Sequence, residues 1–242
     1  MAHVIMVASG KGGTGKSTFA TYLSTELALK KQKTLLIELD AGLRSIDVIS
    51  GTDRKAVYDI GDILRGRCKA EKAMIISPHT DNLFIIAAPY KNYDTDFSGF
   101  RAVIDSVYND FDFIIIDTAA GLGNAFQAAC RASVTGIVVV TPDIISVRDG
   151  RLVSDEMFAA GVTDVRLIIN KFSQQTFRFS GFEDIDDIID RVCARLLGVI
   201  PMSAQIAVSA ISGEELQPAS IEKQIFSAVS QRIMGKDVQI VL

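Results

Sequence analysis

The residues Gly10-Lys11-Gly12-Gly13-Thr14-Gly15-Lys16-Ser17-Thr18 form the stretch that decides the fold of this chain. An apolar run, His3–Ala8, precedes them, and Phe19, Leu23 and Leu27 follow at every fourth position. The run predicts a buried strand, and the spacing predicts one face of a helix. A stretch that joins a strand to a helix and fits G-x-x-x-x-G-K-[ST] is typical of a phosphate-binding loop.

The residue types in this loop explain how it would hold a phosphate. Glycine permits left-handed torsions and a close approach of the backbone to a ligand. The helix that follows offers free N–H groups and a partial positive charge at its first turn. We therefore expect Lys16 to reach the β- and γ-phosphates of a nucleotide and the Ser17 hydroxyl to bind Mg²⁺.

Composition limits the classes of protein to which the chain can belong. With 242 residues, of which 48% are hydrophobic, residues 1–242 are expected to form a single α/β domain. A net charge of −4 gives no global basic field for nucleic acid. Cys68, Cys130 and Cys193 are far apart and form no C-x-x-C pair, which is typical of a reducing cytosol. No signal peptide opens the sequence and no apolar run approaches the roughly 18 residues of a membrane span. These features predict a cytoplasmic protein.

Apolar runs alternate with helical patterns along the rest of the chain. Further strands are predicted at Thr34–Leu39, Leu83–Ala88, Phe113–Ile116, Ile137–Val140, Arg166–Asn170 and Leu197–Ile200, the last capped by Pro201. Helices are predicted near Ile60–Leu64, over Phe97–Tyr108 and Asp143–Ala160, and along the stripes Ile185, Ile188, Ile189, Val192, Leu196 and Ile221, Ile225, Val229, Ile233. This alternation predicts a mostly parallel central sheet with helices on both faces, a three-layer αβα fold. With its phosphate loop, the fold class is that of a P-loop NTPase.

Two aspartates lie where strands of the predicted sheet end, and ligands of such sheets bind at the carboxyl ends of the strands. Asp117 follows an apolar strand, an arrangement that holds Mg²⁺ beside a γ-phosphate. Asp40 ends the second strand and is a candidate for orienting an attacking water. It is equally suited to a turn or a helix cap, and its spacing alone favours neither role.

Several segments together resemble the MinD/ParA family of ATPases. Lys11 turns the loop into K-G-G-x-G-K-[ST], which resembles the deviant Walker A motif of that family. Residues 38–47 (ELDAGLRSID) resemble its switch segment D-x-D-x-G-L-R-N-L-D, and residues 113–121 (FIIIDTAAG) resemble F-I-I-I-D-S-P-A-G. Further matches occur at Thr141-Pro142, Ser146–Asp149, Asn170, Pro201 and Arg232–Val238. The resemblance covers nearly the whole chain in register and is closer to the septum-site-determining MinD branch than to ParA partition proteins.

The resemblance implies a role for each matched residue. The catalytic set would be Lys11, acting in trans across an ATP-held dimer, Lys16, and Asp40, which would position the hydrolytic water. Ser17 and Asp117 would hold Mg²⁺. The residues implied in binding ATP or ADP are Gly10, Lys11, Gly12, Gly13, Thr14, Gly15, Lys16, Ser17 and Thr18, with Asn170 at the adenine edge and Pro201 beside the base.

By this resemblance, the function would be that of an ATP-dependent dimerising ATPase switch. Such a switch positions a cellular structure, such as the division septum, through a regulatory or effector protein partner. One alternative is a ParA-like or flagellum- or pilus-associated ATPase; another is a nucleotide-gated binding module with negligible turnover. The basic run Arg65–Lys69 is the only local support for DNA binding. A metallocluster carrier is disfavoured because its paired cysteines are absent.

The sequence also departs from the family pattern. MinD ends in an amphipathic membrane-targeting helix, whereas Lys236–Leu242 would span about 10 Å as a helix and carries one lysine. Direct membrane binding is therefore not expected, although association through a partner remains open. Glu38 replaces an aspartate, where its longer side chain can shift the switch segment, and Ala119 replaces a proline. Residues 173–183 form either a partner-binding loop or an ordinary surface loop.

Overall fold

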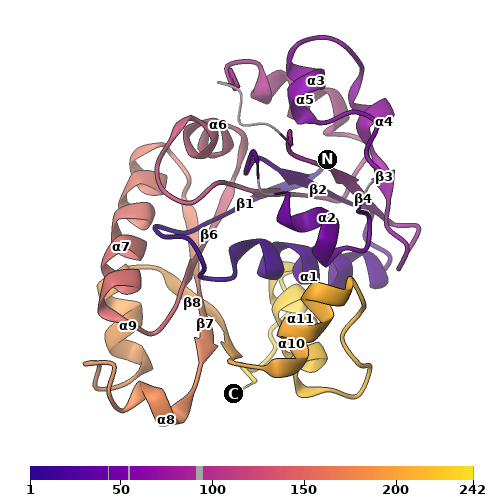
Figure 1. The fold of residues 1–242 in the computed structure, drawn as a ribbon. Helices are drawn as coiled ribbons and strands as arrows, with labels where there is room; N and C mark the ends of the chain where they lie inside the picture. Colours follow the sequence, from indigo (N-terminus) through magenta and orange to yellow (C-terminus); the bar gives the residue numbers. More distant parts are fainter. Residues whose placement is uncertain (43, 54, 91–94, 242) are drawn as a thin grey trace.

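A single mixed sheet runs through the computed structural model, which describes residues 1–42, 44–53, 55–90 and 95–241. The sheet has eight strands in the order β3-β4-β2-β5-β1-β6-β7-β8 (Figure 1). Its strands are β1 His3–Ala8, β2 Thr34–Glu38, β3 Ile75–Ile76, β4 Leu83–Ile86, β5 Phe113–Asp117, β6 Thr135–Val140, β7 Asp164–Phe172 and β8 Arg195–Pro201. Neighbouring strands are parallel except for β3 and β4 at one edge, so the predicted mostly parallel sheet is confirmed.

Helices cover both faces of this sheet. They are α1 Lys16–Leu29, α2 Ser45–Ile49, α3 Ile60–Leu64, α4 Ala70–Ala73, α5 Phe100–Val107, α6 Asn124–Ala132, α7 Ile144–Ala159, α8 Gln174–Phe177, α9 Ile185–Val192, α10 Ala204–Ser212 and α11 Ile221–Ile233. One apolar cluster joins the sheet to α5, α6, α7 and α9, and a second joins its other face to α1, α2 and α11 (Figure 1). The predicted three-layer αβα architecture is therefore confirmed. Among the described residues, no helix has the length and apolarity needed to cross a membrane.

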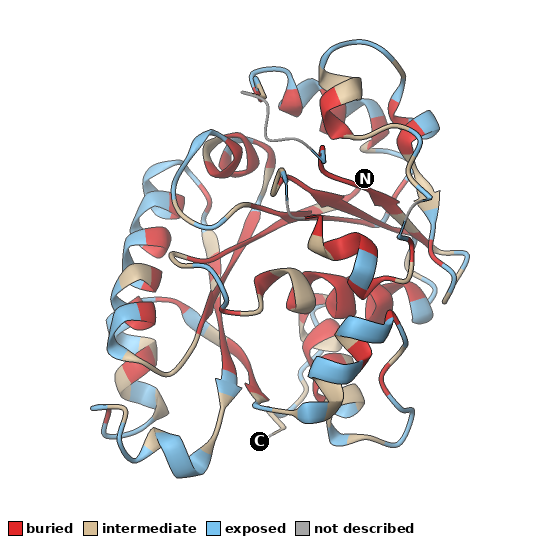
Figure 2. Cartoon of the chain, in the orientation of Figure 1, coloured by how far each residue is buried: buried red, intermediate tan, exposed pale blue. Residues whose placement is uncertain are grey.

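The two clusters explain why the strands appear in the sequence as continuous apolar runs. Leu35 and Ile37 of β2 belong to one cluster, and Leu36, between them, belongs to the other. Successive side chains of a strand point to opposite faces, so both faces of β2 are buried. Figure 2 shows the central strands buried throughout, whereas α7 and α10 expose their outer sides.

The sequence predicted the elements better than it predicted their ends. The prediction that the helical stripe from Ile185 continues to Leu196 is wrong, because α9 ends at Val192. Cys193 follows in a left-handed conformation with φ 58°, which reverses the chain, and β8 begins at Arg195. Pro201 is the last residue of β8 rather than a cap outside it. Helices α2, α4, α6, α8 and α10 and the short strand β3 were not predicted.

The packing of α11 on α1 supplies a test of the core. Phe226 is 1% exposed. Its ring centroid lies 6.1 Å from that of Phe19 and 5.3 Å from that of Tyr22. We expect Phe226→Ala to lower the free energy of unfolding by about 3–5 kcal/mol, measured by urea denaturation, because it removes buried apolar contacts and leaves a cavity. Phe179→Ala is the control, since Phe179 is 90% exposed. Equal losses in the two variants would contradict this account of the core.

Candidate nucleotide-binding site

The loop between β1 and α1 has glycine where its backbone touches neighbouring elements. Gly15 has φ 87°, and a Cβ there would collide with Nδ2 of Asn170 on β7. A Cβ on Gly10 would lie 2.5 Å from Cβ of Asp149 on α7. Gly13 has φ 80°, in the left-handed region that favours glycine. The loop is therefore seated between β7 and α7, as a cradle for a phosphate requires.

A hollow of about 440 Å³ lies over this loop. Its volume is in the range of pockets that hold small ligands. The loop supplies most of the lining, and the rest comes from helix α2 and from residues that follow β2 and β5. The lining residues are Ser9, Lys11, Gly12, Gly13, Thr14, Gly15, Lys16, Ser17, Thr18, Asp40, Ser45, Ile49, Ala119 and Ala120. The structure thus brings the predicted loop residues and Asp40 together around one hollow.

Lys16 and Asp117 form a buried ion pair beneath the loop. Nζ of Lys16 lies 2.8 Å from Oδ1 of Asp117, and the two side chains are 7% and 0% exposed. Oδ2 of Asp117 is buried and has no hydrogen-bond partner among the described residues. A buried carboxylate oxygen without a partner is costly, and a cation or its water would satisfy it.

The donor set at this point suits Mg²⁺. Ser17 Oγ lies 3.5 Å from Nζ of Lys16, so the Ser17 hydroxyl is close to the end of the Lys16 side chain. No group of three or more His, Cys, Asp or Glu side chains that could hold a metal occurs in the described part of the chain. Mg²⁺ commonly takes one or two protein ligands and completes its shell with substrate phosphates and water. The predicted ligands Ser17 and Asp117 therefore fit this ion.

Asp40 lies half-buried two residues after the end of β2, in the lining of the hollow. Burial raises the pKa of its carboxyl, the Lys16 ammonium opposes this rise, and the Asp117 carboxylate adds to it. Asp40 thus shares the electrostatic environment of the Lys16–Asp117 pair. This placement is compatible with the predicted contact to an attacking water.

Lys11 forms an ion pair within its own chain. Nζ of Lys11 lies 3.2 Å from Oδ1 of Asp143, and the side chains are 37% and 44% exposed. Asp143 also caps α7, because Oδ1 accepts a hydrogen bond from the Ser146 backbone N–H at 2.9 Å. Sequence reasoning did not identify Asp143, although it directly precedes α7.

Asn170 and Pro201 lie at the same carboxyl edge of the sheet. Nδ2 of Asn170 donates to the Thr14 carbonyl at 2.7 Å, so this amide supports the loop. Pro201 ends β8 in register with Phe172 of β7. The contacts of Asn170 and Pro201 with the adenine base remain predictions.

The switch segment is anchored by Glu38, the residue that departs from the family pattern. Its fully buried carboxyl accepts hydrogen bonds from the backbone N–H of Ile46, at 3.2 Å, and of Ala88, at 3.5 Å. Burial, assisted by the nearby Asp117 and Asp47 carboxylates, raises the pKa of Glu38 to about 8. The contacts thus tie the start of α2 to the end of β2.

The same segment contains a second buried ion pair that was not predicted. Nη2 of Arg44 lies 2.6 Å from Oδ2 of Asp47. The Arg44 guanidinium also lies over the Tyr90 ring, 3.7 Å from its centroid. Arg44 and Asp47 both belong to the quoted switch motif. That motif was the only feature of the sequence that pointed to this ion pair. Leu43 of that motif lies outside the described residues.

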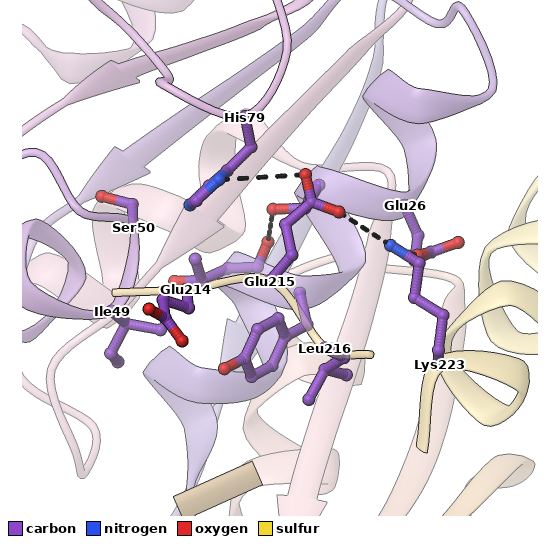
Figure 3. A pocket seen from close by; sticks show the side chains of 11 residues that line it. Glu26, Ile49, Ser50, His79, Glu214, Glu215, Leu216 and Lys223 are labelled. Atoms are coloured by element: carbon purple, nitrogen blue, oxygen red, sulfur yellow. Dashed lines mark hydrogen bonds and ion pairs between the residues drawn. The ribbon is translucent and has the colours of Figure 1, made fainter. Parts of the chain in front are cut away.

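A much smaller cavity lies between α1 and the segment Glu214–Leu216 (Figure 3). Its volume is about 10 Å³, close to that of one water. Beside it, Nζ of Lys223 pairs with Glu26 at 3.0 Å and with Glu215 at 3.1 Å, and His79 Nδ1 lies 3.8 Å from Glu215 (Figure 3). These contacts connect α1, α11 and the turn before β4. The cavity is too small for a nucleotide.

Two surface predictions also have a structural outcome. In the basic run Arg65–Lys69, Arg65 and Arg67 both pair with Asp62, at 3.2 Å and 3.0 Å, so one neighbouring carboxylate offsets part of the positive charge of the run. In the segment 173–183, residues Gln174–Phe177 form the short helix α8, and Phe179 is 90% exposed.

Comparison with known proteins agrees with this geometry. A family model described as AAA domain matches residues 2–154. The septum site-determining protein MinD of Synechocystis sp. is 30% identical over 98% of this chain and 91% of its own length. A chain from the MinC:MinD cell division protein complex of Aquifex aeolicus superposes with a TM-score of 0.91 at 28% identity, over 100% of this chain and 99% of that chain. The septum site-determining protein MinD of Pyrococcus horikoshii, complexed with Mg-ADP, gives a TM-score of 0.86 at 26% identity over 96% of each chain.

The raised pKa of Glu38 predicts how stability depends on pH. Between its ordinary value of 4.5 and about 8, the folded protein keeps a proton on Glu38 that the unfolded chain has released. Raising the pH through this window therefore favours unfolding. We expect the free energy of unfolding of the nucleotide-free protein to fall from pH 5 to pH 8, and this fall to be smaller in Glu38→Gln. Urea titrations across the window measure both slopes, with the exposed Glu71→Gln as control. A Glu38→Gln slope equal to that of the control would contradict the assignment.

Proposed function

The chain belongs to the MinD/ParA family of P-loop ATPases, and on this premise we propose that it is an ATP-dependent switch that regulates the placement of cell division. The site that carries the proposal is the glycine cradle over the buried Lys16–Asp117 pair. Relatives named as septum site-determining or cell division proteins support the process. The cofactors are ATP/ADP and Mg²⁺.

Charge is the main contribution of the protein to phosphoryl transfer. When bound, Mg²⁺ neutralises negative charge on the β- and γ-phosphates, and Ser17 and Asp117 are the residues that would hold it. Lys16 is paired with Asp117 in the structure. We propose that the Lys16 ammonium turns to the phosphates when the nucleotide binds, which releases the Asp117 carboxylate for the metal.

Asp40 is proposed as the group that orients the attacking water. Its position in the lining of the hollow, two residues after the end of β2, supports this role. Burial and Asp117 both raise the pKa of its carboxyl, although Lys16 opposes them. A carboxylate with a raised pKa is a stronger base and is better suited to accept a proton from water.

Dimerisation is proposed to complete the site. Lys11 would leave Asp143 and reach the nucleotide of a second copy of the chain. Its 37% exposure and its ion pair at the rim of the hollow support a side chain that can be released. We further propose that hydrolysis is slow and stimulated by a partner, and that an effector protein recognises the dimer. The solved MinC:MinD complex of Aquifex aeolicus supports a protein effector.

The water-orienting role of Asp40 gives the first test of turnover. We expect Asp40→Ala to bind a fluorescent ATP analogue within about threefold of the wild-type affinity, while its single-turnover hydrolysis falls roughly 100-fold or more. Asp81→Ala is the control, because Asp81 is exposed and does not line the hollow. This variant should hydrolyse ATP at the wild-type rate. If the wild-type protein binds ATP but neither it nor the variant hydrolyses it, the enzyme assignment is wrong and a static nucleotide-gated module is correct.

The trans role of Lys11 is tested by oligomeric state. We expect Lys11→Ala to bind ATP but to remain monomeric in sedimentation velocity runs with ATP and Mg²⁺, and to lose stimulated turnover. Asp143→Asn is the matched variant, because asparagine still caps α7 but no longer pairs with Lys11. It should dimerise at the same or a lower protein concentration. ATP-dependent dimerisation of Lys11→Ala at the wild-type concentration would exclude the proposed role.

A further inference from the structure

β7 carries an irregularity where it passes the phosphate loop. Ile169 pairs with Val199 and Phe172 pairs with Pro201, so β7 has one residue more than β8 between these two pairs. Within this bulge Lys171 adopts φ 56°. Bulges commonly lie beside functional sites, where they redirect a side chain.

The left-handed conformation of Lys171 lacks the usual explanation. Lys31 and Cys193 are also left-handed, but each lies at the end of a helix, where this conformation commonly terminates the helix. Lys171 lies inside a strand. Holding a residue with a Cβ in this region is unfavourable, so neighbouring contacts must stabilise it.

Those contacts are with the phosphate loop. Nζ of Lys171 donates to the Gly13 carbonyl at 2.7 Å, and Nδ2 of Asn170 donates to the Thr14 carbonyl at 2.7 Å. Two adjacent residues of β7 therefore hold two consecutive carbonyls of the loop.

This arrangement sets the direction of the loop N–H groups. No cis peptide bond occurs in the described residues, and in a trans peptide the C=O and N–H point in opposite directions. Because the Gly13 and Thr14 carbonyls point to β7, the N–H groups of Thr14 and Gly15 point away from it. Neither N–H has a partner within the described part of the chain. They are therefore available to an anion.

Lys171 also differs from the other two lysines at the loop in its charge balance. Lys11 is paired with Asp143 and Lys16 with Asp117. Lys171 has no carboxylate within ion-pair distance among the described residues, and its partner is a neutral carbonyl. Its ammonium therefore adds a positive charge beside the loop that is not paired with any of the described carboxylates.

We propose that Lys171 is a positioning residue of the nucleotide site. Its left-handed backbone directs the ammonium to the Gly13 carbonyl, which holds the loop with the N–H groups of Thr14 and Gly15 directed toward the phosphates. The inference rests on the proposed function, because it assumes that the loop binds a nucleotide. It assigns Lys171 to the preparation of the loop and to electrostatic attraction, with no part in proton transfer.

The test separates backbone strain from the contact with the loop. Asparagine and glycine both tolerate the left-handed region, and neither can reach the Gly13 carbonyl. We expect Lys171→Asn and Lys171→Gly to weaken binding of a fluorescent ADP analogue about tenfold, without lowering the melting temperature of the nucleotide-free protein. The KM for ATP should rise more than kcat falls. Lys171→Arg, which keeps a cationic donor, should bind within about threefold of wild type.

Lys31→Asn is the matched control, because Lys31 is an exposed left-handed lysine that follows α1, outside the lining of the hollow. It should bind the ADP analogue as the wild-type protein does. Wild-type affinity in both Lys171→Asn and Lys171→Gly would overturn the proposal and leave Lys171 as a bulge residue only. Failure of the wild-type protein to bind the analogue would instead overturn the proposed function, and the inference with it.

Discussion

The site is organised around the buried ion pair between Lys16 and Asp117. Both side chains are withdrawn from water, and a buried charge is tolerated only when it is paired. The pair therefore fixes the first residue of α1 against the end of β5. It also leaves Oδ2 of Asp117 without a partner in the described residues. The folded protein thus contains a charge arrangement that an incoming nucleotide and its metal would complete.

The switch segment depends on the same charges. Glu38 and Asp117 are paired in register on neighbouring strands, so the two carboxyl groups lie close together. Burial, with the nearby Asp117 carboxylate, raises the pKa of Glu38, whereas Asp117 is paired with the Lys16 ammonium. The Glu38 carboxyl is then bonded to the backbone N–H of Ile46 at the start of α2. A change at Asp117 would therefore alter the electrostatic field at the residue that anchors the switch segment.

Sequence reasoning predicted the parts of this structure that depend on local chemistry. Strands such as His3–Ala8 are recognisable because both of their faces are buried, and the phosphate loop is recognisable because its glycines and lysine occur in a fixed order. Helix α10 was missed because its apolar residues form only a weak stripe. Helix α6 was missed although its apolar residues lie on one face, because most of them are alanines with little apolar bulk. The end of α9 depends on one left-handed residue, Cys193, which no pattern identified.

The contacts that support the loop were unpredictable for a different reason. The bonds from Asn170 and Lys171 to the loop carbonyls depend on the register of β7, more than 150 residues away in the chain. The pairing of Lys11 with Asp143 likewise depends on how α7 sits against the loop. Such contacts follow from tertiary packing, which cannot be predicted from the order of residues in the loop.

The Lys11–Asp143 and Lys16–Asp117 ion pairs differ in burial, and they therefore differ in the free energy needed to separate them. The Lys11–Asp143 pair is 37% and 44% exposed, and pairs of this kind contribute about 0–1 kcal/mol. Its separation also leaves α7 capped, because Asp143 keeps its bond from the Ser146 N–H. Breaking the buried Lys16–Asp117 pair without a replacement would cost about 3–5 kcal/mol. Lys11 is therefore free to leave its partner at little cost, whereas Lys16 can leave Asp117 only when phosphate and metal charges take over both roles.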